Sequence, residues 1–535
     1  MLKNALTICV WYIARTKILF YKYLRKVPSL GLFLYFRHMV SRFFQAYRNS
    51  SAALLALLWL LLLYIVIAIS AEGPAGGQDS WNHYLFARWS LKHPILMLDL
   101  WGKPFFTILS APFAQLGITA LYTLNMLATL GSAWITYLSG RKLGMRNPWM
   151  LILLFGLQPI ILANFHSALT EPTNALVLVF VIYKLISYRY ATAIVIASFL
   201  PIIRTEGLVL VAAILPFLYL KGKLKYIPLL LSGTVFFAIL AALISGEWDY
   251  FISHNPYFKF ESEGKFDPGS GSFWHYAQAQ KAITGFWITL LMVVAFFLIL
   301  DYIYSRVKKR TPHEMSQFVL WLFLPLFGAY FFAHSFIWYA GMMGSHGLIR
   351  VFVVVSPVAA LIAQYSLHRI MVMDVRLLNR AIKTITTGVA SLIAINGAGV
   401  LSGFSGNASI PGYPGRQLWF NAIDSIKSLG YNNYVLVHQL PELNVHLDLD
   451  PFEDPQKIQE SRTQYLWSLD TRAGYDWFPE NTVILWDNFH ARRDAPMPLD
   501  TLRSLGTYKE LLHLQHETDS LYDVRVFVHK GFPRQ

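Results

Sequence analysis

Long apolar stretches separated by short polar or basic turns recur throughout residues 1–404. Stretches of about 18 apolar residues or more are long enough to cross the ~30 Å hydrocarbon core of a bilayer. The pattern therefore predicts an α-helical polytopic membrane protein with about eleven transmembrane helices. The predicted spans are 49–71, 116–140, 149–165, 173–187, 191–220 (two short crossings), 226–245, 282–304, 315–336, 347–367 and 384–401.

Lys and Arg gather in every second loop between these stretches, for example in 141–146, 221–225 and 306–310. Cytoplasmic loops retain these residues, so the alternation predicts a cytoplasmic N-terminus. The loop after Ala71 and the chain after Leu401 then lie outside. In a bacterium this describes a multi-pass protein of the inner (plasma) membrane whose C-terminal part is periplasmic.

The stretch 191–220 has basic residues at both ends, Arg189 and Lys221, so an even number of crossings must lie between them. Pro201 and Pro216 predict two short segments, with the turn Arg204-Thr205-Glu206-Gly207 outside. Segments this short cannot face lipid across a whole bilayer. We expect other helices to shield them, or the segments to line a cavity.

Changes in composition divide the chain into three predicted parts. Residues 1–50 mix basic and aromatic residues without any acid, which is typical of helices lying on the cytoplasmic membrane surface, although a partly disordered basic tail fits as well. Residues 51–404 form the transmembrane domain. A Gly/Ser/Pro-rich linker then leads into residues 405–535, a small extramembrane α/β domain with strands predicted at 434–437, 483–486 and 524–528 and a helix at 499–514.

Composition narrows the class of protein further. The chain is 55% hydrophobic and 14% charged, with a net charge of +15, whereas a soluble domain carries about 25% charged residues. The basic residues are scattered among apolar spans, so we attribute them to cytoplasmic loops and expect no nucleic-acid partner. The single Cys excludes an intramolecular disulfide and argues against a Cys-based metal site.

The first outer loop, 76–113, carries the strongest candidate chemistry. Asp79 stands where the chain leaves the membrane, just before a predicted amphipathic helix over 80–91, and His83 would share a helical face with it. A carboxylate beside apolar surface can act as a general base. The alternative is an Asp that only caps the N-terminus of the helix.

Shorter polar patterns lie in the same loop and in later outer segments. Together with Asp79 they are Lys103-Pro104-Phe105, Thr170-Glu171-Pro172, Arg204-Thr205-Glu206-Gly207, and Arg350 ahead of Ser356-Pro357. This set, within residues 51–370, resembles the GT-C membrane glycosyltransferases, which use polyprenyl-phosphate sugars. That superfamily includes protein O-mannosyltransferases and the bacterial aminoarabinose transferases of lipid A.

The resemblance implies a role for each of these residues. An Asp of the first outer loop serves the reaction in that superfamily, and Asp79 corresponds to it. Lys103 is similar to the Lys of a Lys-Pro-Pro segment that faces the lipid phosphate, although the second Pro is missing here. The other patterns are similar to the acidic turn of the second outer loop, to an Arg-Pro-Glu-Gly turn with Thr in place of Pro, and to an Arg that opens a late helix.

Physical chemistry supports a phosphate-binding role for Lys103, Arg204 and Arg350. Arg offers phosphate a forked pair of hydrogen bonds and Lys offers a point charge. Either stabilises the charge that develops on a leaving lipid phosphate. The alternative for each is a base that only snorkels to the interface. Glu171 is a second candidate catalytic acid, which would assist Asp79 or orient the acceptor, unless it merely starts a helix ahead of Pro172.

Aromatic and His side chains in the outer loops are candidate substrate contacts. Those we single out are His83, Trp101 and His346. Trp side chains can stack on sugars, but anchoring at the membrane interface explains them as well. The outer His residues could also bind a divalent cation together with Asp79 and Glu171, although no His spacing is diagnostic of a metal site.

The sequence therefore predicts an inverting glycosyltransferase with a GT-C-like fold. It would move a hexose such as mannose from a polyprenyl phosphate to a hydroxyl of a lipid, glycan or protein acceptor, with Asp79 as the general base. The sugar and the inversion are implied by the resemblance alone. Two alternatives stay open: a non-enzymatic transporter or lipid-linked glycan flippase, and aminoarabinose-type transfer to lipid A.

Overall fold

The structure, a computed structural model of the chain, describes residues 30–71, 73–254, 269–307, 314–343, 345–372, 416–431, 434–438, 440–452, 463–465, 480–488, 499–517 and 522–532. The chain divides into two compact units, 1–56 and 57–535. Helix α2 (Leu30–Ser70) runs through that boundary and through the predicted boundary at residue 50. The predicted last span at 384–401 and the linker after it lie outside the described residues.

Within the described residues, five helical segments are long and apolar enough to cross a membrane. Each coincides with a predicted span. They are Ser50–Ser70 of α2, α5 (Ile118–Lys142), η2 (Leu224–Leu230) with α12 (Leu231–Ser245), α17 (Phe286–Val307), and α18 (Glu314–Phe318) with η3 (Val319–Phe323) and α19 (Leu324–Ala340). The total of about eleven crossings remains a prediction.

Two predicted spans are wrong as single helices. The span 149–165 consists of α6 (Met150–Gly156) and α7 (Pro159–Asn164), because Pro159 has no N–H to continue α6 and starts a new helix. The span 347–367 consists of a 3₁₀ turn, η4 (Ile349–Val353), followed by α20 (Ser356–Val372). A hydropathy pattern records length and apolarity, so it does not detect such breaks.

The stretch 191–220 is broken where the sequence predicted a turn. It forms α9 (Tyr190–Ala197), α10 (Leu200–Ile203) and α11 (Gly207–Leu220), and Arg204 and Glu206 lie in the turn between α10 and α11. Pro216, in contrast, lies inside α11 and does not end it. The predicted span 173–187 is α8 (Glu171–Ile186), which begins at Glu171.

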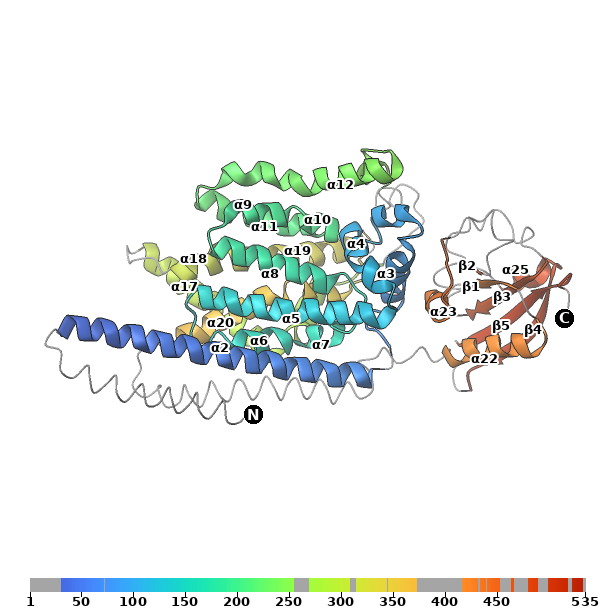
Figure 1. Cartoon of the computed structure of the whole chain (residues 1–535), viewed down its shortest axis with the longest axis horizontal. Helices are drawn as coiled ribbons and strands as arrows, with labels where there is room; N and C mark the ends of the chain where they lie inside the picture. The colour runs from blue at the N-terminus through green and yellow to red at the C-terminus, as the bar shows by residue number, and fades with distance from the viewer. Residues whose placement is uncertain are drawn as a thin grey trace, which may run out of the picture. The chain divides into compact units, whose positions relative to one another are not determined.

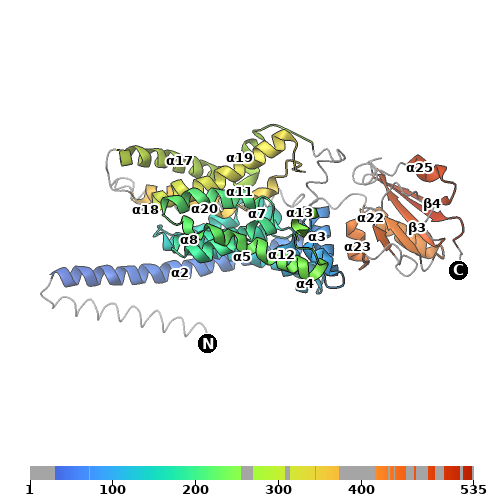
Figure 2. The ribbon, with the colours of Figure 1, turned by 90° about the horizontal axis from the view of Figure 1, so that it is seen from above.

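Helices α5 and α8 run side by side (Figures 1 and 2). The loop that leads into the site directly precedes α8 and is held by α5. Asn125 of α5 is fully buried, and its Nδ2 donates to the carbonyl oxygens of Ser167 and Leu169 at 2.8 and 2.7 Å. Because a buried amide is costly to leave unpaired, these two bonds fix the backbone just ahead of Glu171. Helix α11 likewise packs on α19, and α17 on α20.

Short helices fill the predicted outer loops. The first loop contains α3 (Gln78–Trp89), η1 (Pro94–Leu98) and α4 (Pro104–Ala114), and later ones contain α13 (Tyr250–Ser253), α15 (His275–Gln278) and α16 (Gln280–Ile283). The helix predicted at 80–91 is confirmed as α3. Gly77 occupies its N-cap and Asp79 is its second residue, with no side-chain cap hydrogen bond. The structure thus excludes the alternative in which Asp79 merely caps the helix.

The described part of residues 416–532 forms a five-stranded mixed sheet of order β2-β1-β3-β5-β4. Strands β1, β2 and β3 are parallel, and β5 is antiparallel to β3 and β4. Helix α22 packs on one face and α25 on the other. The elements are α22 (Arg416–Ser428), β1 (Val435–His438), α23 (Pro441–His446), β2 (Thr463–Tyr465), β3 (Thr482–Asp487), α25 (Leu499–Ser504), β4 (Tyr508–Gln515) and β5 (Asp523–His529).

Three of these strands, β1, β3 and β5, occur where the sequence predicted them. The helix predicted over 499–514 is wrong in its second half, because α25 ends at Ser504 and β4 begins at Tyr508. Gly506 between them has φ +67°, a left-handed conformation that ends a helix without strain. The placement of this sheet outside the membrane remains a prediction.

Candidate active site

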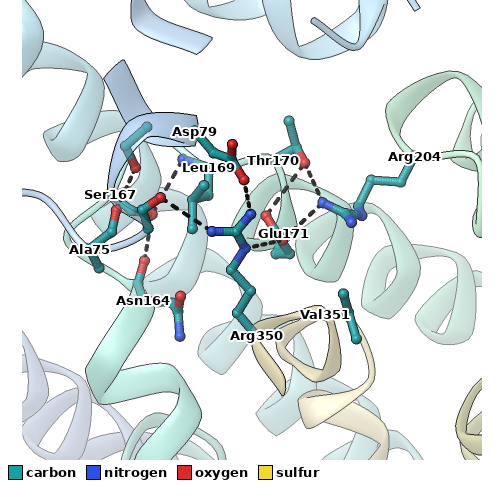
Figure 3. Close-up of polar contacts among 12 residues, drawn as sticks. Ala75, Asp79, Asn164, Ser167, Leu169, Thr170, Glu171, Arg204, Arg350 and Val351 are labelled. Carbon is teal, nitrogen blue, oxygen red and sulfur yellow. Dashed lines mark hydrogen bonds and ion pairs between the residues drawn. The ribbon is translucent and has the colours of Figure 1, made fainter. Parts of the chain in front are cut away.

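A row of five charged side chains joins four separate elements, and Figure 3 shows four of the five, Asp79, Arg350, Glu171 and Arg204. Arg350 of η4 pairs with Asp79 of α3 through Nη2, and its Nε lies 3.4 Å from Glu171 Oε1. Arg204 contacts the same Glu171 oxygen through Nη1 at 2.9 Å and Glu206 Oε1 through Nη2 at 2.7 Å. The order Asp79–Arg350–Glu171–Arg204–Glu206 alternates in sign, and we call it the charge row.

Glu171 is the central member of the charge row and the least accessible. Its side chain is 1% exposed and is shared by both arginines. It is the first residue of α8, where the positive end of the helix dipole also favours a carboxylate. Thr170 adds a further contact, since its Oγ1 accepts a hydrogen bond from Arg204 Nη1 at 2.8 Å. A carboxylate so enclosed holds two arginines in place and is poorly placed to meet a substrate.

Asp79, at one end of the charge row, is accessible, with 37% of its side chain exposed. Burial of its surroundings alone would raise its pKa, but the charge and hydrogen bond of Arg350 outweigh that effect and hold the pKa of Asp79 below its usual range. At the other end, burial likewise opposes ionisation of Glu206, yet Arg204 lowers its pKa to about 2. Both terminal acids are therefore anionic at neutral pH.

The first and second outer loops are locked together beside Asp79. Ala75 N donates to His166 O at 2.9 Å, and Ala168 N donates to Ser80 Oγ at 3.2 Å. Arg350 Nη1 donates to Gly76 O at 3.2 Å. Gly76 has φ +89°, and a Cβ there would lie 2.6 Å from a methyl group of Leu169. Only Gly satisfies both the backbone conformation and the close approach.

Lys103 ends a tight turn at the start of α4. Its backbone has φ +66°, an uncommon conformation for a residue with a Cβ, and the residue is 8% exposed. The turn is built by Asp99, whose Oδ1 accepts from Gly102 N at 2.6 Å, and by Thr107, whose hydroxyl donates to Gly102 O. Residues held in such a conformation cost of order 1–3 kcal/mol and gather at functional sites.

Lys103 lies near enough to the charge row for its charge to affect the pKa of Glu206. The positive charge of Lys103 acts to lower the pKa values of Asp99, Glu206 and His83. The charges of Asp79, Arg204 and Arg350 also affect the pKa of His83. Burial raises the pKa of Asp99 despite the backbone N–H groups of the turn and the nearby Lys103. The first outer loop thus brings a buried Lys and an exposed Asp to one site.

His83 and Trp101 form an aromatic wall of that site. Their rings stack with centroids 5.1 Å apart, and Phe106 meets the His83 ring edge-on at 5.7 Å. His83 is 6% exposed, and its Nδ1 has no hydrogen-bond partner among the described residues. Burial lowers the pKa of His83 to about 3, so it is neutral at physiological pH. A neutral, unpaired ring nitrogen is suited to a polar ligand.

His346, another predicted site residue, lies outside the charge row. It is exposed, with φ +49°, in the turn that precedes η4. The other outer His residues do not gather either: His254 pairs with Glu247, His275 bonds the Gly347 carbonyl, and His166 packs on Tyr122. Among the described residues, no group of three or more His, Cys, Asp or Glu could hold a metal ion.

The far end of α3 is fixed by the segment after α23. Arg88 makes a forked contact with Asp448 at 3.2 and 3.1 Å, while Lys92 and His93 contact Asp450 at 2.9 and 2.8 Å. Because Asp450 is buried, this contact is more than a loose surface pair. The helix that carries Asp79 at its start is therefore anchored at its end as well.

The sequence places Glu206 in a predicted turn but indicates no role for it. Neither Gly76 nor Thr170 is predicted to contact an Arg, although both do so in the structure. Glu206 could have been found as an acid two residues after a candidate phosphate-binding Arg. The carbonyl of Gly76 could not, because nothing in a sequence marks a backbone oxygen as a partner of a side chain 274 residues away.

Comparison with protein-family models and with curated protein sequences finds no match. Comparison with solved structures finds ArnT from Cupriavidus metallidurans in the apo state, with a TM-score of 0.52, and bound to undecaprenyl phosphate, with a TM-score of 0.54. Both alignments cover 89% of this chain and 99% of ArnT at 12% identity. The chain has the ArnT fold.

ArnT is an aminoarabinose transferase of the GT-C type. The resemblance to GT-C enzymes that the outer-loop residues indicated is thus confirmed for the fold. The apolar helices and the ArnT fold together indicate a multi-pass membrane protein. At 12% identity the ArnT fold alone does not assign a role to Asp79 or to any other residue of the site.

Proposed function

We propose that the chain is an integral-membrane glycosyltransferase that takes a sugar from a polyprenyl phosphate and transfers it to an acceptor hydroxyl at the outer face of the inner membrane. The observation that carries the proposal is the pairing of an accessible carboxylate, Asp79, with a cluster of cations, Arg350, Arg204 and Lys103. A sugar phosphate needs both: cations for the phosphate and a base for the incoming hydroxyl.

The donor phosphate fits best beside Lys103. Lys103 is the N-cap residue of α4, an 11-residue helix that Pro104 starts, so it lies at the positive end of the helix dipole. Arg350, at 17% side-chain exposure, and Arg204, at 13%, lie within electrostatic reach of His83 as well. The aromatic wall of His83 and Trp101 would then face the sugar, with stacking from Trp101 and a hydrogen bond at His83 Nδ1.

In the proposed reaction, the acceptor oxygen attacks the anomeric carbon while Asp79 removes its proton. The bond between the anomeric carbon and the phosphate oxygen breaks, and its electron pair stays on the lipid phosphate. One displacement of this kind inverts the anomeric carbon. Glu171 acts in this scheme by positioning the two arginines rather than by touching the substrate, since it is 1% exposed.

The sugar is open between a hexose such as mannose and aminoarabinose, and the acceptor is open among a lipid such as lipid A, a glycan and a protein. The ArnT fold favours the aminoarabinose alternative, and the bound undecaprenyl phosphate in one ArnT structure supports a polyprenyl-phosphate partner. Because fold does not fix substrate, we keep both sugars in the test. A transporter or flippase would share the fold features but would break no glycosidic bond.

The deciding experiment incubates the purified full-length protein with several polyprenyl-phosphate sugars, including the mannosyl and aminoarabinosyl forms, and an acceptor extract. Release of free polyprenyl phosphate is measured. We expect release with one donor and a matching gain of sugar on the acceptor. Movement of intact donor across a vesicle membrane without any release would instead identify a flippase.

The topology makes a separate prediction. The basic loops place the N-terminus inside and the C-terminal sheet outside, so a reporter active only in the cytoplasm should be silent when fused after Gln535. The same reporter fused after Lys223, in a predicted cytoplasmic loop, is the positive control. A strong signal from the C-terminal fusion would place the sheet, and Asp79 with it, on the wrong side for this function.

Replacing Arg350 by Ala is expected to weaken donor binding about 10- to 100-fold, which corresponds to the ~1.5–3 kcal/mol of a charge-assisted hydrogen bond. The measurement is the affinity of the purified variant for a polyprenyl-phosphate sugar. Arg88→Ala is the control, because it removes an ion-paired Arg at the far end of α3, the helix that carries Asp79. Donor affinity equal to that of wild type would assign Arg350 a purely structural role.

A further inference from the structure

Each of the three guanidinium nitrogens of Arg350 lies near a polar group of the protein, although Nε makes no hydrogen bond among the described residues. Nη2 contacts Asp79, Nη1 donates to Gly76 O at 3.2 Å, and Nε lies 3.4 Å from Glu171 Oε1 (Figure 3). A guanidinium has five N–H donors, so these contacts do not use all of them. A phosphate that makes a forked contact with two of the nitrogens nevertheless competes with the partners already there.

The three partners differ in how easily they can be replaced. The Gly76 carbonyl belongs to the backbone that the two outer loops lock together, and Glu171 is 1% exposed and is held by Arg204 as well. Asp79 is 37% exposed and sits on the helix surface. Asp79 is therefore the partner that a phosphate at the site would displace, because it alone can turn toward water or a ligand.

The charges of the reaction change in a way that matches this exchange. A polyprenyl-phosphate sugar is a phosphodiester with one negative charge, whereas the released polyprenyl phosphate is a monoester that approaches two, since its second pKa is about 6. Over the same step Asp79 gains the acceptor proton and loses its charge. One negative charge thus leaves one side of Arg350 and appears on the other.

We propose that Arg350 is passed from Asp79 to the leaving phosphate as the sugar is transferred, so that proton uptake by the base and stabilisation of the leaving group are coupled through one guanidinium. This proposal rests on the proposed function and deepens it. The other groups that face Asp79 are His83 on α3 and Arg204 in the turn before α11. Among the described residues, neither forms an ion pair with Asp79, so Arg350 is the one placed to couple the two events.

If this coupling holds, Asp79 and the product phosphate compete for Arg350, so removing the Asp79 charge should tighten binding of the phosphate. Asp79→Asn removes the competing charge but keeps the size and a hydrogen-bond acceptor for Arg350. We expect the full-length variant to bind undecaprenyl phosphate at least about tenfold tighter than wild type, the effect of one charge-assisted contact of ~1.4 kcal/mol or more. For a methyl phosphodiester of the same lipid, with one charge less, we expect a smaller gain.

Glu206→Gln is the matched control. It removes the same charge from the other end of the charge row, where the partner is Arg204 and not Arg350. A long-range effect of lost negative charge would tighten lipid binding equally in both variants, which would overturn the proposal. A tighter Asp79→Asn complex with a nearly unchanged Glu206→Gln complex would support it.

A second readout is spectroscopic and starts from the wild-type protein. Infrared difference spectra on addition of undecaprenyl phosphate should show a protonated carboxyl band that is missing in Asp79→Asn. Binding without this band, and with equal affinity in wild type and Asp79→Asn, would overturn the coupling but leave the proposed function standing. If undecaprenyl phosphate does not bind to wild type at all, the proposed function fails together with the coupling.

Discussion

Asp79→Asn is expected to slow sugar transfer at least ~100-fold, because a general base contributes typically ~10²–10⁴-fold to the rate. The amide cannot take up a proton near neutral pH. The fold should survive, since Asp79 makes no cap hydrogen bond, its side chain is 37% exposed, and Asn can still accept from Arg350. Single-turnover transfer with donor in excess, on protein matched to wild type in thermal stability, is the measurement.

The same variant separates the three interpretations of Asp79. A base predicts slow transfer with donor still bound, and a purely structural acid predicts normal transfer or lost stability. A transport-coupling carboxylate predicts no transfer in wild type either. The variant Asp99→Asn is a useful comparison, because Asp99 lies in the same loop and holds the turn before Lys103. If Asp79→Asn transfers sugar within a few-fold of wild type, Asp79 is not the base.

Glu171→Gln is expected to lower the free energy of unfolding by about 3 kcal/mol, the lower end of the range for removing one partner of a buried ion pair. We choose the lower end because each arginine keeps a second carboxylate: Arg350 keeps Asp79, and Arg204 keeps Glu206. The loss should still be large, since Glu171 is 1% exposed and joins both cations. Equilibrium unfolding in mixed micelles would measure it.

Glu206→Gln is again the comparison for this stability effect. Glu206 is 20% exposed and pairs with one arginine only among the described residues, so we expect a loss of about 1 kcal/mol or less. If the two Gln variants are equally stable, the two arginines do not depend on Glu171. If Glu171→Gln keeps full stability but loses all transfer, Glu171 acts on the substrate directly, as a catalytic acid rather than a positioning one.

Sequence analysis identified four of the five members of the charge row but not their pairing. Asp79, Glu171, Arg204 and Arg350 each stood out as a charged residue at an outer end of an apolar stretch. The ion pairs between different elements, Glu171–Arg204, Glu171–Arg350 and Asp79–Arg350, depend on how distant parts of the chain pack, and no local pattern records that. The sequence therefore favoured Arg350 as a free phosphate ligand, whereas the structure shows it bound to Asp79 and Glu171.

The errors in the fold have a similar origin. The pattern over 499–514 is compatible with a helix, but β4 is stabilised by pairing with β5, a contact with a later part of the chain that propensity does not include. The span 149–165 is apolar apart from Gln158 and Asn164, so its mean hydropathy does not show that Pro159 divides it. Long spans with basic flanks, such as α5 and α17, were predicted correctly because length and charge alone define them.

The locked outer loops imply that these positions evolve together. Gly76 fits against Leu169 and offers its carbonyl to Arg350, so a change at any one of the three alters the space or the bond of another. In an alignment of relatives, we therefore expect Gly to be kept at 76 wherever a branched apolar side chain such as Leu occupies 169. A chimera that imports only the first outer loop from a relative should fail, whereas one that also imports the chain from Asn164 to Glu171 should assemble.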